Sequence, residues 1–200
     1  MNKSIKSLFL LSGLAVGAAN AATPGERLLG IWTGSEKGYE NNVYTDSVVE
    51  YAIVQAKDNS AIGYKLEKKQ GAANWEKVSS VSATVTSSSV VSTFEQGPAS
   101  EGRIINNRLE LRLDDPATNG ELLVRAIRDK NLKSINGELP VIPVLKDNAT
   151  LADKKSVLVA LEQARKELLE KANKNGEFKP MFETIDEVLK RFGEQLTNSL

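Results

Sequence analysis

The stretch Gly30-Ile31-Trp32-Thr33-Gly34 places a large indole between two glycines near the start of the chain. A glycine inside a strand marks a position where another part of the structure comes close to the backbone. A tight sheet needs such room beside a side chain as large as Trp32. We therefore expect this stretch to be the first strand of a β-rich domain.

The residues before this strand, Met1–Ala21, have the three parts of a secretory leader. Lysines at positions 3 and 6 form a positive start, an apolar run begins at Leu8, and Ala19-Asn20-Ala21 supplies the small residues that signal peptidase requires. The apolar run is too short to span about 30 Å of hydrocarbon as a helix. We expect export to a bacterial periplasm, cleavage near Ala21 and a mature chain that begins near Ala22.

The composition excludes several classes of function. Without the leader the chain carries 24 basic and 26 acidic residues, and it has no basic run that would attract nucleic acid. No second apolar stretch is long enough for a membrane span. The chain has neither histidine nor cysteine, so imidazole-based triads, histidine-ligated zinc and thiolate chemistry are excluded. No cofactor or metal motif is found, and we predict a protein that is not an enzyme.

The residues up to Lys146 have the pattern of an all-β domain, which we place at 22–146. Turn-forming residues separate short strand-like runs, and Asn136-Gly137 is a strong hairpin signal. On one run, Ile62, Tyr64 and Leu66 alternate with Gly63, Lys65 and Glu67, which predicts one dry and one wet face. Short turns favour an antiparallel up-and-down meander. We expect about eight strands that close into a barrel, and a two-layer sandwich is the alternative.

From Asp147 to Leu200 the apolar period becomes that of a helix. Thr150 is the expected N-cap of a first helix, with Asp153 in its first turn. This helix should end before Gly176, and a second should begin near Pro180. Each carries one apolar stripe, so we predict a helical hairpin that packs on the barrel.

The pattern G-x-W-x-G on a first strand, followed by a β meander and a C-terminal helix, resembles the lipocalins and the wider calycin group. In that family the tryptophan closes one end of an up-and-down barrel, often beneath an arginine from a late strand. The resemblance implies that Arg125 or Arg128 takes this place here. It also implies a barrel that holds a small apolar or amphipathic molecule. The chain lacks the Thr-Asp-Tyr turn of the family and has a two-helix tail in place of one helix.

The aromatic residues that could line such a barrel are Trp32, Tyr51, Tyr64 and Trp75, and we name these four as candidate ligand-binding residues. The first hypothesis for the function is an exported binding protein for a small apolar ligand. The second is an envelope protein-interaction module, or a protease inhibitor-like barrel with a filled interior, whose partner is a protein. The third is an enzyme that uses carboxylates or lysine. The sequence carries no signal for the oligomeric state.

Overall fold

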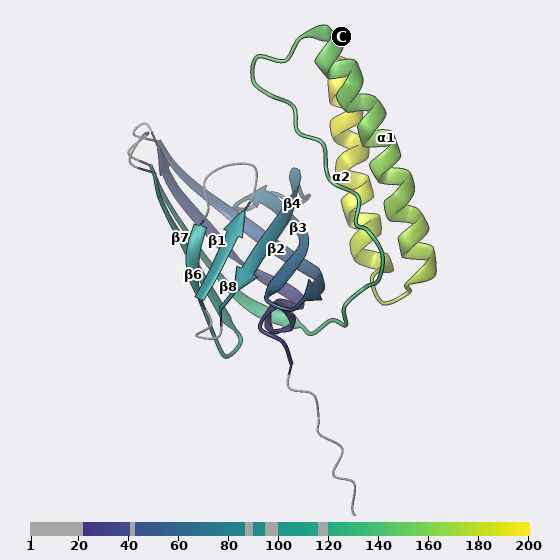
Figure 1. Ribbon diagram of the computed structural model, residues 1–200. Helices are drawn as coiled ribbons and strands as arrows, with labels where there is room; N and C mark the ends of the chain where they lie inside the picture. The colour runs from purple at the N-terminus through teal and green to yellow at the C-terminus, as the bar shows by residue number, and fades with distance from the viewer. Residues whose placement is uncertain (1–21, 41–42, 87–89, 95–99, 116–119) are drawn as a thin grey trace, which may run out of the picture.

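The computed structural model describes residues 22–40, 43–86, 90–94, 100–115 and 120–200. The predicted leader, Met1–Ala21, lies outside the described residues. A short 3-10 turn, η1 (Gly25–Leu28), leads into eight strands. These are β1 (Gly30–Glu40), β2 (Val43–Lys57), β3 (Ser60–Lys69), β4 (Lys77–Val85), β5 (Val90–Phe94), β6 (Ser100–Ile105), β7 (Arg108–Asp115) and β8 (Gly120–Lys130). Figure 1 shows them as one curled sheet beside a pair of helices.

The sheet has the predicted antiparallel up-and-down order. Each strand pairs with the next one along the chain, and β8 also pairs with β1. In the described part of the chain the ladders are uneven, because β1 forms eleven residue pairs with β2, whereas β5 forms four with each neighbour. The pairing thus runs around all eight strands, but the predicted closed barrel is formed only in part. The long strands form a curled half-barrel, and β5 and β6 are joined to it by short ladders.

Both glycines of the opening stretch are required by the backbone of β8. Gly30 has a φ of 143°, which favours glycine, and a Cβ there would clash with the carbonyl oxygen of Lys130. A Cβ at Gly34 would clash with the carbonyl oxygen of Arg125. The glycines thus allow β1 to lie close against β8, and the close approach is to a strand and not to the indole.

The inner face of the sheet is packed with apolar side chains at the end that holds η1, which we call the floor. Trp32 and Val49 are fully buried there. The inner core also contains Leu28, Tyr51, Ile53, Ala61, Val81, Ala83, Val85, Val91, Ile104, Leu109, Leu111, Val124 and Ala126. The opposite end, which holds the β1–β2 and β3–β4 connections, is called the mouth.

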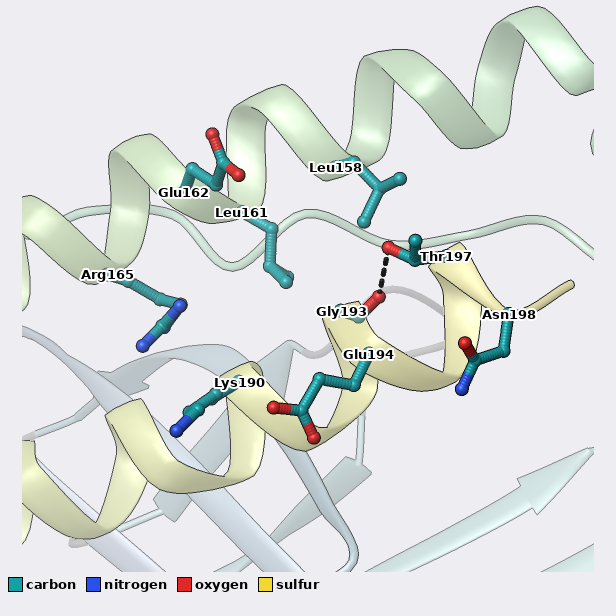
Figure 2. A pocket seen from close by; sticks show the side chains of 9 residues that line it. All are labelled: Leu158, Leu161, Glu162, Arg165, Lys190, Gly193, Glu194, Thr197 and Asn198. Atoms are coloured by element: carbon teal, nitrogen blue, oxygen red, sulfur yellow. Dashed lines mark hydrogen bonds between the residues drawn. The ribbon is translucent and has the colours of Figure 1, made fainter. Parts of the chain in front are cut away.

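The two predicted helices are present as α1 (Leu151–Lys174) and α2 (Lys179–Thr197). Thr150 caps α1 in a capping box with Asp153, and α2 has proline in its first turn, both as predicted. Gly193 of α2 lies against Leu161 and Leu158 of α1, and the Thr197 hydroxyl donates to the Gly193 carbonyl (Figure 2). The helices therefore approach closely and leave a groove that is open to solvent.

The helical hairpin packs on the outer face of the sheet and forms a second core there. The strands contribute Ala52, Val54, Tyr64 and Leu66, and the helices contribute Leu161, Leu168, Ala172, Phe178, Met181, Phe182, Ile185, Val188 and Leu189. The last strand ends at Lys130, before the predicted domain boundary at Lys146. Residues 131–150 instead run along the outside of the sheet, where the Ile135 amide donates to the Val54 carbonyl at 2.8 Å.

Candidate functional site: a charged cluster inside the curled sheet

The side chains predicted to form the wet face of β3 point into the curled sheet. Tyr51 of β2 is paired with Lys65 of β3, and Tyr51 belongs to the inner core. Because side chains alternate along a strand, Gly63, Lys65 and Glu67 share the inner face, while Tyr64 and Leu66 face the helices. The expectation of one dry and one wet face is therefore wrong for this strand, since the hairpin covers its outer side.

Lys65 forms the deepest ion pair of the molecule's described part. Its Nζ lies 2.5 Å from Oε2 of Glu36 on β1, and the two side chains are only 6% and 10% exposed. The ammonium group also lies 5.9 Å from the centre of the Tyr51 ring, which forms its apolar support. The two residues come from strands that both pair with β2, where Glu36 is opposite Ser47 and Lys65 is opposite Tyr51.

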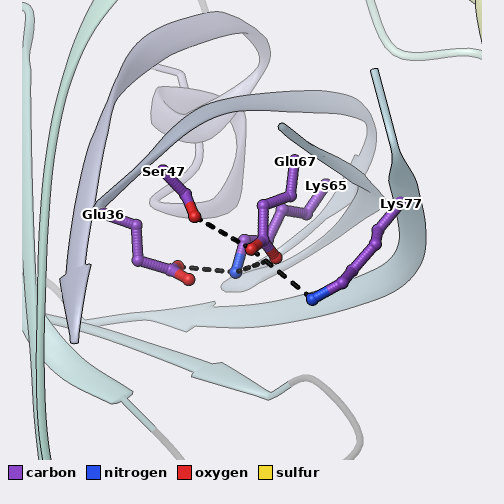
Figure 3. Close-up of polar contacts among 5 residues, drawn as sticks. All are labelled: Glu36, Ser47, Lys65, Glu67 and Lys77. Carbon is purple, nitrogen blue, oxygen red and sulfur yellow. Dashed lines mark hydrogen bonds and ion pairs between the residues drawn. The ribbon is translucent and has the colours of Figure 1, made fainter. Parts of the chain in front are cut away.

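The cluster continues from this pair towards the mouth. Glu67 lies 4.0 Å from Lys65 Nζ, accepts a hydrogen bond of 3.0 Å from the Ser47 hydroxyl, and lies 3.7 Å from Nζ of Lys77. Figure 3 shows the five side chains converging from their strands. Exposure rises in the same direction, from 6% at Lys65 to 23% at Glu67 and 72% at Lys77. The charged cluster (Glu36, Ser47, Lys65, Glu67 and Lys77) thus extends from the interior to solvent.

A buried ion pair is a costly way to fill this space. Each charge loses its hydration, and replacing such a pair with well-packed apolar residues is often neutral or stabilising. The neighbouring inner positions towards the floor, such as Val81 and Val85, are filled by apolar side chains that are at most 2% exposed. Apolar packing alone therefore does not account for the charges at these positions.

The floor is closed by an indole–guanidinium stack. The Trp32 Nε1–H donates to the Leu28 carbonyl at 2.7 Å, and the Arg128 guanidinium carbon lies 4.2 Å from the centre of the indole ring. Arg128 also donates to the carbonyl of Arg27, and burial together with the charge of Arg27 lowers its pKa. Of the two arginines considered from the sequence, Arg128 thus contacts Trp32. Arg125 is exposed and lies 3.9 Å from Glu110.

The four predicted ligand-binding residues are not brought together. Trp32 and Tyr51 belong to the inner core, whereas Tyr64 and Trp75 belong to or pack against the outer core beneath the hairpin. The Tyr64 hydroxyl donates to the Pro140 carbonyl at 2.9 Å, and burial, with the charge of Glu167, raises its pKa. Tyr64 and Trp75 therefore lie with the outer core, and of the four only Tyr51 lies beside the charged cluster.

Sequence reasoning missed all five residues of the charged cluster. The available signal was the alternation on β3, where Lys65 and Glu67 stand between apolar residues. That pattern is equally consistent with an exposed outer face. Only the hairpin's position on the other side of β3 distinguishes the two cases.

The described residues hold no group of three or more acidic side chains arranged to hold a metal ion. Within the same residues, neither helix is long and apolar enough to cross a membrane. Comparison with known proteins finds no family model and no curated protein that matches the chain. The function must therefore be inferred from the geometry of the site itself.

Proposed function

We propose that the chain is an exported, non-enzymatic binding protein that holds a small amphipathic molecule in the mouth half of its curled sheet. The observation that carries this proposal is the charged cluster, in which Glu36 and Lys65 are buried on the same inner face as the apolar inner core. A ligand with a polar end gives these charges a role that packing does not. The calycin-like resemblance supports the same kind of function.

The packed floor half restricts the proposed ligand to the mouth side of the inner core. Trp32 and Val85 are fully buried by their neighbours, so an apolar molecule cannot lie where the resemblance would first place it. Towards the mouth, Leu113 of β7 and Leu122 of β8 are paired with each other and half-buried. By alternation from Leu111 and Val124 of the inner core, both point inward. The mouth half thus combines an apolar side with a charged side.

The two other hypotheses have less support. The interaction module depended on an uncovered helical tail, but the apolar stripes of the hairpin are buried against the sheet. The enzyme required ionisable groups brought together, and the charged cluster does this. Its geometry favours holding over proton transfer, however, because Glu36 is engaged by Lys65 at 2.5 Å and Glu67 by Ser47 at 3.0 Å. We therefore retain binding as the proposed function.

The test blocks the mouth from the inside. Thr45 of β2 is opposite Gly38 of β1 and two residues before Ser47, so its side chain lies on the same inner face as that of Ser47. The next residue, Asp46, points outward, and its carboxylate lies 3.6 Å from Nζ of Lys37. The wild-type protein should enhance the fluorescence of 1-aminoanthracene or cis-parinaric acid. Thr45→Trp should abolish the enhancement, and the matched control Asp46→Trp should retain it. Absence of enhancement with the wild type, or equal enhancement by the two variants, would refute the proposal.

A further inference from the structure

The charges of the cluster alternate in sign along its chain of contacts. Glu36 is followed by Lys65, then by Glu67 and finally by Lys77, with closest contacts of 2.5, 4.0 and 3.7 Å. The four side chains carry two negative and two positive charges, so the cluster as a whole is neutral. A ligand with a single charge would meet repulsion from one sign as well as attraction from the other.

The inner and outer ion pairs of the cluster differ in how easily their two partners can be separated. Glu36 and Lys65 are nine-tenths or more buried and closely paired, so separating them would strand a buried charge. Glu67 and Lys77 lie 3.7 Å apart, which is longer than a hydrogen bond, and Lys77 is 72% exposed. Glu67 keeps its hydrogen bond from Ser47 if Lys77 moves. The outer pair can therefore open at low cost.

We infer, on the basis of the function proposed above, that the ligand is a zwitterionic amphiphile whose headgroup inserts between Glu67 and Lys77. Its cationic part contacts the Glu67 carboxylate, and its anionic part contacts the Lys77 ammonium group. Such a headgroup replaces one opposite-charge contact with two and leaves the inner pair intact. The apolar chain of the ligand lies along Leu113 and Leu122 on the other side of the mouth.

The experiment compares headgroups on one alkyl chain. Dodecylphosphocholine, dodecyltrimethylammonium, dodecyl sulfate and dodecyl maltoside are titrated, each below its micelle concentration, against the protein with bound 1-aminoanthracene. Dodecylphosphocholine should displace the dye at a concentration about tenfold lower than the others, the effect of roughly one added charge-assisted contact. Equal displacement by all four would overturn the inference and leave the proposed function standing. No dye binding at all would overturn both.

Charge variants give a second, reciprocal measurement. Glu67→Gln leaves the cluster with one excess positive charge and should shift the preference towards dodecyl sulfate. Lys77→Gln, at an exposed position that does not endanger folding, should shift it towards dodecyltrimethylammonium. The surface pair Lys179 and Glu183 on α2, 3.7 Å apart and half exposed, provides controls with the same changes in net charge. If Lys179→Gln and Glu183→Gln shift the preferences equally, the headgroup does not bind at Glu67 and Lys77.

Discussion

Phe182 is the side chain that most directly joins the helical hairpin to the sheet. It is fully buried in the outer core, with its ring centre 6.3 Å from that of Tyr64 on β3 and 6.0 Å from that of Phe178. Truncation of a buried phenylalanine to alanine costs about 3–5 kcal/mol. Because two aromatic contacts, each worth about 0.5–1.5 kcal/mol, are lost within that figure, we expect Phe182→Ala to lower the free energy of unfolding by about 4 kcal/mol.

The assay is urea unfolding followed by two signals. Circular dichroism in the helical band reports mainly on α1 and α2. Tryptophan fluorescence is measured in a Trp75→Phe background, where it reports on Trp32 in the inner core and not on Trp75 beside the outer core. Tyr64 and Lys65 are adjacent on β3 and face the outer and inner sides of the sheet, so loosening the outer core should also loosen the inner one. The unfolding transitions seen by the two signals should therefore shift together to lower urea concentrations. The control Val159→Ala, at a position 70% exposed on α1, should change stability by less than about 0.5 kcal/mol.

Two results would refute this reasoning. A loss below about 1 kcal/mol for Phe182→Ala would show that the ring is not packed as the outer core requires. A shift of the helical signal without a shift of the Trp32 signal would show that the hairpin unfolds independently of the sheet.

Three further predictions concern charge, pH and processing. Lys65→Met strands Glu36 and should lower the free energy of unfolding by about 3–5 kcal/mol, whereas the double variant Glu36→Gln/Lys65→Met should recover most of the loss in urea titrations. Burial raises the pKa of Tyr64 in the folded state, so its contribution to stability is complete below the unfolded pKa of about 10 and is lost as the pH rises above it. Urea midpoints measured from about pH 8 to about pH 11 should therefore fall less steeply for Tyr64→Phe than for the wild type. N-terminal sequencing of the protein from a periplasmic fraction should start near Ala22, and an intact N-terminal methionine would contradict the proposed leader cleavage.

The helical hairpin was predictable because its signals are local. The capping box at Thr150 and Asp153 and the proline in the first turn of α2 act within a few residues, so the helix starts agree with the structure within about one residue. The antiparallel order of the strands was also predictable, because short turns join neighbouring runs. Closure of the sheet was harder to predict. It depends on the pairing of β1 with β8, which are far apart in the sequence, and on the ladders of β5, which are short.

The candidate site was poorly predictable because period-two alternation identifies two faces without saying which is inside. Tyr64 and Lys65 are neighbours on β3, and the sequence favoured the aromatic ring as the inward residue. The structure has the reverse arrangement, because the hairpin supplies a second apolar environment for the Tyr64 side. Tyr51 belongs to the inner core and is opposite Lys65. This pairing between strands, which the sequence does not show, would have revealed the cluster.

Two parts of the curled sheet, β2 with β3 and β5 with β6, should differ in how readily they open locally. β2 and β3 are enclosed by the inner core on one side and by the outer core on the other. Among the described residues, β5 forms four pairs with each neighbour and contributes nothing to the outer core. Local opening is cheapest where the fewest contacts break. Amide protons of β5 and β6 should therefore exchange with deuterated solvent well before those of β2 and β3. Local opening at β5 and β6 would let the proposed ligand enter or leave while the rest of the fold stays intact.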